Sequence, residues 1–202
     1  AGTHGKTTTA AMIAWALRAI GADPAFFVGG EVPGVGEAGA AANAGWGEGE
    51  WVLAEADESD GSFLELRPEI AVLTNVEMDH PDYFADRDAV LASMERFVRG
   101  MSSHPALGGR LLLTTAADRG AQDLLGRLGD WDGRVIRYGP GGEVQASELE
   151  LSAGGASFRL FEQAFEMSLA GEHNVLNATA ALTLARELGA QSLLYTPSHE
   201  TH

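Results

Sequence analysis

The first nine residues, AGTHGKTTT, contain the residue types that bind phosphate. Gly5, Lys6 and Thr7 follow a glycine-containing loop, in which successive backbone N–H groups can converge on phosphate oxygens. The lysine ammonium reaches the outer phosphates, and the threonine hydroxyl can bind Mg²⁺. The competing explanation is chance, because Gly-Lys-Thr is a common tripeptide and the first glycine of the usual pattern would fall before Ala1.

Apolar residues after this loop favour the phosphate-binding interpretation. They recur with the period of a helix between Thr7 and Ile20. The loop therefore leads into a helix N-terminus, where the helix dipole attracts anions. A loop of this kind normally follows a buried strand, so we expect such a strand before Ala1 and interpret the chain as a fragment of a longer protein.

Two polar clusters are predicted to lie at the same edge of a sheet as this loop. Residues 55–60 (EADESD) and 75–80 (NVEMDH) come at the ends of apolar runs typical of buried strands, at 50–56 and 69–76. In an open parallel sheet, ligands bind beyond the carboxyl ends of the strands. Glu55 and His80 are therefore candidate Mg²⁺ ligands, although Mg²⁺ prefers oxygen. An exposed acidic turn and a surface histidine at a helix entry remain the alternatives.

The rest of the chain predicts an α/β fold, with a mostly parallel sheet flanked by helices and a small antiparallel sheet near the C-terminal part. Further strands of the main sheet are expected at 24–30, 110–114 and 134–138. Helices are expected at 86–99, 117–128 and 173–188, and antiparallel strands at 143–151, 156–161 and 164–169.

Two regions lack such patterns. Residues 30–50 are rich in glycine and alanine, and we expect a loop there with at most one weak helix. Within them, residues 34–39 fit the G-x-G-x-x-G pattern of a dinucleotide site, which we reject because Pro33 interrupts the preceding strand. We assign residues 1–190 to one domain and residues 191–202 to a tail outside it.

Composition restricts the class of partner. The chain has 202 residues, with 13 Lys and Arg against 29 Asp and Glu and a net charge of −16. This charge disfavours nucleic acid and anionic membranes as partners, because both need a basic surface. One nucleotide remains possible, because backbone N–H groups and a single cation can hold its phosphates. Lys6 is the only lysine of the chain. Cysteine is absent and no apolar run could span a membrane, so we expect a cytoplasmic protein.

Five segments together resemble the Mur ligase family. They are GTHGKTTT at 2–9, FFVGG at 26–30, EADESDGSF at 55–63, TNVEMDHPDYF at 74–84 and GEHNVLNATAAL at 171–182. Their order and spacing resemble the central ATP-binding domain of the family over nearly its whole length. EADESD favours the alanine-adding branch. The family's N-terminal and C-terminal domains, which hold the other substrates, are absent from this sequence.

The resemblance implies roles for particular residues. Lys6 would contact the β- and γ-phosphates of ATP, and Thr7 and Glu55 would bind a first Mg²⁺ ion. His80 would bind a second Mg²⁺ ion, with Glu95 as a candidate helper whose alternative is an exposed pair with Arg99. The remaining nucleotide contacts would come from residues 2–8, which we call the phosphate loop, and from the last helix. They are Gly2, Thr3, His4, Gly5, Thr8, Asn174 and Asn177. Helix capping is the alternative for the two asparagines, and it suits Asn174 better.

The resemblance also implies a reaction, in which Lys6, Glu55 and His80 serve catalysis. L-Alanine would be joined to the carboxylate of UDP-N-acetylmuramate through an acyl phosphate, at the expense of ATP. The alternatives are a murein-peptide ligase, which attaches a tripeptide to the same acceptor, and a nucleotide-binding fragment without activity of its own.

Overall fold

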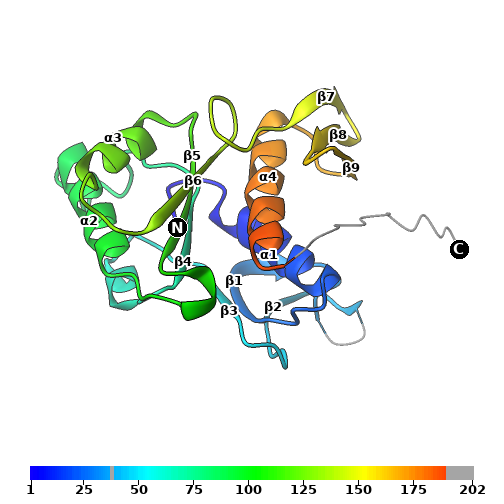
Figure 1. The fold of residues 1–202 in the computed structure, drawn as a ribbon, viewed down its shortest axis with the longest axis horizontal. Coiled ribbons are helices and arrows are strands. Elements are labelled where there is room, and N and C mark those ends of the chain that lie inside the picture. Colours follow the sequence, from blue (N-terminus) through cyan, green and yellow to red (C-terminus); the bar gives the residue numbers. More distant parts are fainter. Residues whose placement is uncertain (37–38, 190–202) are drawn as a thin grey trace, which may run out of the picture.

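A parallel sheet of three strands stands at the centre of the fold (Figure 1). The computed structural model describes residues 1–36 and 39–189. The sheet has the order β4 (Ile70–Leu73), β5 (Leu111–Thr115) and β6 (Arg134–Tyr138). Every residue of β5 is buried, as expected for a central parallel strand whose two faces are both covered.

Helices cover both faces of this sheet. α2 (Arg87–Arg99) and α3 (Arg119–Arg127) lie on one side, and α1 (Lys6–Ala19) and α4 (Glu172–Glu187) lie on the other (Figure 1). Leu112 packs in the cluster of α2 and α3, whereas Leu111 and Leu113 pack with α1 and α4. Asp86 and Asp118 cap α2 and α3 by accepting hydrogen bonds from N–H groups of the first turn.

Two further sheets complete the fold. In the first, β1 (Ala25–Val32) pairs in parallel with β3 (Val52–Ala54) and antiparallel with β2 (Ala42–Gly45). Phe26 and Val28 of β1 pack against α1. In the second, β7 (Ser147–Ser152), β8 (Gly155–Leu160) and β9 (Gln163–Met167) form an antiparallel sheet that packs on α4. Short 3₁₀ helices occur at Ser62–Glu65 and Pro105–Leu107.

The α/β fold, its helices and its strands confirm most of the sequence predictions, but residues 30–50 were predicted wrongly. That region contains β2, whose sequence is ANAG. Alanine, asparagine and glycine have low strand propensity, so β2 is formed by its pairing with β1 and not by its own sequence. Gly45 is required there, because a Cβ would lie 2.5 Å from the Phe26 ring.

Smaller differences concern the ends of elements. The strand expected from residue 143 begins at Ser147, because Glu143 is instead paired with Arg137, accepting hydrogen bonds from its N and Nε. The proposed tail at 191–202 lies outside the described residues, so the boundary at residue 190 stays a prediction. In the described part of the chain, no helix has the length and apolar character needed to cross a membrane.

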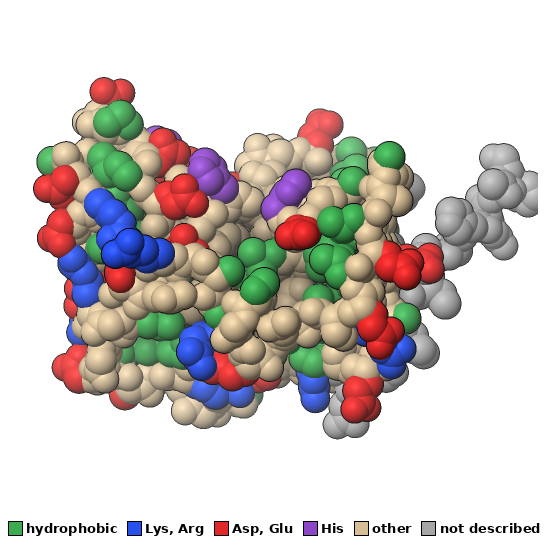
Figure 2. Space-filling view, turned by 90° about the horizontal axis from the view of Figure 1, so that it is seen from above, with side chains coloured by type: hydrophobic (Ala, Val, Ile, Leu, Met, Phe, Trp, Pro, Cys, Tyr) green, Lys and Arg blue, Asp and Glu red, His purple; other side chains and the backbone are tan. Residues whose placement is uncertain are grey.

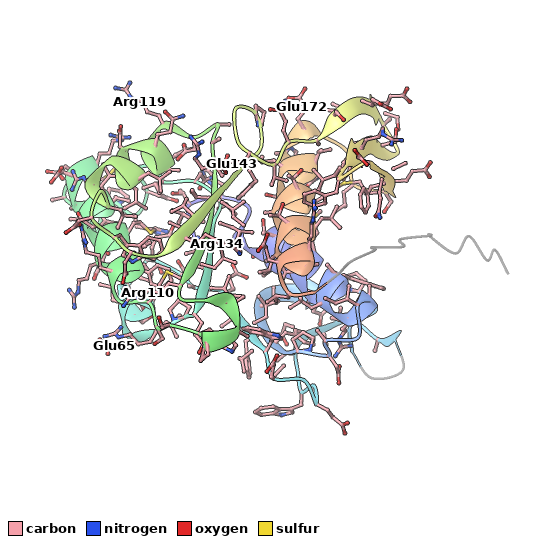
Figure 3. All side chains as sticks on the ribbon, in the orientation of Figure 1. Glu65, Arg110, Arg119, Arg134, Glu143 and Glu172 are labelled. Atoms are coloured by element: carbon pink, nitrogen blue, oxygen red, sulfur yellow. The ribbon has the colours of Figure 1, made fainter. Side chains whose placement is uncertain are left out.

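The elements share a common polarity. Figure 3 shows Arg119 and Glu172, the first residues of α3 and α4, at the same end of the molecule, with Arg110 and Glu65 toward the opposite end. Because Arg110 comes just before β5 and α3 follows it, the carboxyl end of β5 lies at the end that carries these helix N-termini. This is the end at which parallel α/β sheets bind their ligands.

Ala1 is hydrogen-bonded to β4 and to the residue that follows it. Its N–H donates to the Val72 carbonyl oxygen at 2.9 Å, and its carbonyl oxygen accepts from the Thr74 N–H at 3.1 Å. These two bonds fix the start of the glycine-containing loop beside β4.

Candidate functional site

The loop before α1 is bound to the segment that follows β4. The Thr74 hydroxyl donates to the His4 carbonyl oxygen at 2.6 Å, and the His4 N–H donates to Asn75 Oδ1 at 2.9 Å. The Glu77 N–H donates to Thr3 Oγ1 at 3.0 Å. These bonds bring the glycine-containing loop and the second polar cluster together, as the sequence predicted.

The first turn of α1 has no side-chain cap. α1 begins at Lys6 with Gly5 at the N-cap, in the left-handed region at φ 77°, and no side chain accepts a hydrogen bond from the first turn. The first N–H groups of a helix have no partner within the helix. Gly5 is doubly required, because a Cβ there would also lie 2.9 Å from Asn177 Oδ1. The arrangement leaves an open helix N-terminus, with Thr7 exposed on it.

Glu55 lies at the end of β3 and is held by both of its oxygens. Oε1 accepts from the Thr7 hydroxyl at 2.9 Å, and Oε2 accepts from the Gly29 N–H at 2.7 Å. A Cβ at Gly29 would lie 3.0 Å from Oε2, and one at Gly30 would lie 3.1 Å from Thr7 Cγ2. The two glycines of FFVGG therefore let β1 approach the carboxylate closely, a role that the sequence alone did not reveal.

Glu58 is the functional candidate that sequence reasoning missed. Its carboxylate is only 2 % exposed, and Lys6 Nζ donates to its two oxygens at 3.1 and 3.3 Å. Lys6 also donates to the Thr3 carbonyl oxygen at 3.4 Å. Nothing in the run EADESD distinguishes a buried carboxylate from its exposed neighbours, so only the fold reveals this pair.

His80 lies next to the same carboxylates. Asp57, Glu58 and His80 each offer a ligand atom, and these atoms lie within 4.8 Å of one another. His80 has a positive φ of 52°, and its backbone N–H donates to Asp79 Oδ1 at 2.8 Å. The structure thus brings His80 to the site, beside Glu58.

The two asparagines differ in their surroundings. Asn177 is buried beside Gly5, which places its amide at the base of the phosphate loop. Asn174 is partly exposed, and its Nδ2 donates to the Ala170 carbonyl oxygen at 2.8 Å, just before the helix. This contact is not a helix cap, because the Asn174 amide donates instead of accepting, and the N-cap residue of α4 is Gly171, without a side-chain cap.

Glu95 is not part of this group. Its Oε1 accepts from Arg99 Nε at 2.9 Å, and the same arginine contacts the Arg127 carbonyl oxygen and Asp130 at the end of α3. Glu95 is therefore a helix-surface residue paired at i+4, the alternative stated from the sequence.

Negative charge surrounds the phosphate loop. Asp57 lies 3.9 Å from Lys6 Nζ, and Glu77 lies 3.9 Å from His4 Nε2. In Figure 2, histidine side chains lie beside Asp and Glu, while the Lys and Arg side chains of that face lie elsewhere. Lys6, 13 % exposed, is the basic side chain in direct contact with this acidic group. A polyanion bound here would need more positive charge than Lys6 supplies.

Comparison with known proteins identifies the family. Residues 1–185 match the Mur ligase middle domain. The chain belongs to the Mur ligase family. Two curated relatives are named UDP-N-acetylmuramate–L-alanine ligase. The Caulobacter vibrioides protein is 39 % identical and covers 95 % of this chain, and the Mycolicibacterium smegmatis protein is 46 % identical and covers 94 %. The chain spans 40 % and 39 % of their lengths, respectively.

Solved structures of the family share the fold. A UDP-N-acetylmuramate:L-alanyl-γ-D-glutamyl-meso-diaminopimelate ligase from Neisseria meningitides superposes with a TM-score of 0.75 at 32 % identity, covering 93 % of this chain and 60 % of that one. A UDP-N-acetylmuramate–alanine ligase from Thermotoga maritima gives 0.72 at 28 % identity, covering 93 % of this chain and 40 % of that one. The mixed α/β architecture is therefore that of the Mur ligase middle domain.

The Lys6–Glu58 contact predicts a non-additive pair of substitutions. Lys6→Met should destabilise the fold by about 3 kcal/mol, because it leaves a buried carboxylate without its cation. Lys6→Met combined with Glu58→Gln should recover most of that loss, since the amide carries no charge. Urea unfolding of both single variants and the double variant measures the coupling. A double variant as unstable as Lys6→Met alone would show that the ion pair is not what stabilises this corner.

Proposed function

We propose that the edge formed by the phosphate loop and the ends of β3 and β4 binds ATP together with Mg²⁺. The observation that carries the proposal is the uncapped N-terminus of α1, beside Lys6 and the linked pair of Thr7 and Glu55. Free N–H groups at a helix start suit phosphate oxygens. A hydroxyl and a carboxylate 2.9 Å apart offer the oxygen donors that Mg²⁺ prefers.

Each candidate residue has a place in this proposal. Lys6 and the backbone N–H groups of residues 2–8 would hold the phosphate oxygens, with Thr3, His4 and Thr8 in the loop. Thr7 and Glu55 would bind one Mg²⁺ ion, and His80 would bind a second beside Asp57 and Glu58. Asn177 lies against Gly5, where it can contact the nucleotide, and Asn174 is one turn nearer the start of α4.

The electrostatics support a requirement for divalent cations. Three carboxylates, those of Glu55, Asp57 and Glu58, lie around Lys6 and Thr7, and a triphosphate would add further negative charge. Mg²⁺ would neutralise charge on the transferred phosphoryl group. Lys6 would then act between Glu58 and the phosphate, because its three N–H donors allow it to contact both.

We propose for the longer protein the activity named for its relatives. That protein would use ATP to activate the carboxylate of UDP-N-acetylmuramate as an acyl phosphate, and the amine of L-alanine would displace phosphate to form the amide. This chain would hold and orient the phosphoryl group, so that a second anion, the carboxylate, can approach it. Other parts of the longer protein would bind the UDP and amino-acid substrates, and the reaction would take place in the cytoplasm.

A Glu55→Gln substitution tests the metal role. The amide has the same shape but lacks the charge that attracts Mg²⁺, so ADP binding without metal should stay within about twofold, and the gain on adding Mg²⁺ should fall by about tenfold or more. Calorimetric titration of ADP with and without Mg²⁺ measures this gain. Glu150→Gln, an identical change on exposed β7, is the matched control. An undiminished Mg²⁺ gain in Glu55→Gln would refute the ligand role.

The substrate is tested in the full-length protein. Phosphate release from ATP should require both UDP-N-acetylmuramate and L-alanine. Release that instead requires the tripeptide L-alanyl-γ-D-glutamyl-meso-diaminopimelate would identify the murein-peptide ligase, the activity named for the Neisseria meningitides neighbour. No release with either amine, despite Mg²⁺-dependent ADP binding, would leave the binding site standing and overturn the proposed reaction.

A further inference from the structure

The residues on either side of Val76 are hydrogen-bonded to the phosphate loop. Before it, Asn75 Oδ1 accepts from the His4 N–H at 2.9 Å. After it, the Glu77 N–H donates to Thr3 Oγ1 at 3.0 Å, and the Thr3 hydroxyl in turn donates to the Glu77 carbonyl oxygen at 3.3 Å. The position of the phosphate loop therefore depends on the position of residues 75–77.

Val76 itself is held by a different element, the N-terminus of α3. Its N–H donates to Asp118 Oδ1 at 2.9 Å, and its side chain is buried in the cluster of α2 and α3. α3 approaches so closely that a Cβ at Gly120 would lie 1.8 Å from the Val76 carbonyl oxygen. Because Val76 is only 2 % exposed, its N–H group depends on a partner from the protein.

Asp118 makes two hydrogen bonds with one oxygen atom. Oδ1 also accepts from the Ala121 N–H at 2.7 Å, and this second bond caps α3. Asp118 and Val76 are 42 positions apart in the chain, so the bond between them is a tertiary contact and not a part of the cap. The same oxygen thus joins the first turn of α3 to the segment after β4.

This contact leads to both polar groups of the proposed site. In one direction it leads through Glu77 to Thr3, whose carbonyl oxygen accepts from Lys6 Nζ at 3.4 Å. In the other direction, His80 follows Val76 by four residues and lies beside the carboxylates of the site. A displacement of Val76 would therefore move the support of the phosphate loop and the segment that carries His80.

We propose that Asp118 is a positioning residue for the nucleotide site. Its carboxylate acts through the Val76 N–H and fixes the segment that supports the phosphate loop and ends at His80. The inference rests on the proposed binding of ATP and Mg²⁺ at this edge of the fold. It adds the N-terminus of α3 to the elements that determine the geometry of the site.

Asp86 offers a matched control, because it caps α2 in the same way. Its Oδ1 accepts from the Ala89 N–H at 2.9 Å, which corresponds to the bond from Ala121 to Asp118. Within the described residues, the Asp86 carboxylate makes no hydrogen bond to the segment after β4. Alanine at either position removes one helix cap and one negative charge, so the bond to Val76 is what distinguishes the two variants.

Calorimetric titration of ADP with Mg²⁺ tests the proposal at a temperature at which all four chains are folded. Asp118→Ala should weaken binding by about tenfold, because it leaves the buried Val76 N–H without a partner and the segment must shift. Asp86→Ala should stay within about twofold of the unsubstituted chain. Asp118→Asn should also stay within about twofold, since its amide oxygen can accept both hydrogen bonds. The two Asp118 variants lose the same charge, so their difference reports the hydrogen bonds.

Amide exchange provides a second measurement that needs no ligand. Exchange of the Glu77 amide proton, followed by NMR, should be about tenfold faster in Asp118→Ala than in Asp86→Ala, because this N–H group bonds to the phosphate loop beside Val76. Equal exchange rates in the two variants would overturn the positioning role. An Asp118→Ala chain that does not fold, where Asp86→Ala does, would assign Asp118 to stability alone and also overturn it.

The binding data separate this inference from the proposed function. If the unsubstituted chain binds ADP with Mg²⁺, equal affinities of Asp118→Ala and Asp86→Ala overturn the positioning role, as does binding by Asp118→Asn that is as weak as by Asp118→Ala. If the unsubstituted chain binds no ADP with Mg²⁺, the proposed function fails, and the exchange rate of the Glu77 amide still decides whether Asp118 positions the segment.

Discussion

The attachment of the phosphate loop to the ends of two strands is the constraint on which the site depends. Bonds from Thr74, Asn75 and Glu77 hold residues 3 and 4 from one side, and the Thr7–Glu55 bond holds the start of α1 from the other. An open helix N-terminus has no internal partners for its first N–H groups, so its position must be maintained from outside. Because the loop is held from both strands, the first N–H groups of α1 are directed to the edge of the fold at which residues 55–60 and 75–80 lie.

Sequence reasoning succeeded where a residue's role follows from periodicity or from its place along a strand. Glu55 and His80 come at the ends of apolar runs, and both lie at the predicted edge of the fold. The reasoning failed where the role depends on tertiary contacts. The ANAG segment becomes β2 only through pairing with β1, and Gly29 acquires its role only because Glu55 folds against it. Asn174 and Asn177 have the same residue type, yet only Asn177 is buried at the loop.

Burial of Glu58 shows why an acidic motif can be functional in a protein that is already strongly acidic. The net charge of −16 makes one more exposed carboxylate nearly irrelevant, because solvent and salt screen it. A carboxylate that is 2 % exposed interacts strongly with its neighbours, and here its neighbour is the only lysine of the chain. The pair restricts the lysine side chain to one region, which reduces the entropy that it would lose on contacting a ligand.

The free edge of β7 has a consequence for self-association. Within residues 1–36 and 39–189, β7 pairs with β8 alone. All six residues of β7 are exposed, and Leu149 and Leu151 are 40 % and 46 % exposed. Such an edge can pair with its counterpart on another molecule, and amyloid-like assembly begins from edges of this kind. Glu148 and Glu150 alternate with the leucines, so two copies meeting along β7 would bring like charges together. The negative charge of these glutamates therefore opposes polymerisation along an edge that is otherwise aliphatic.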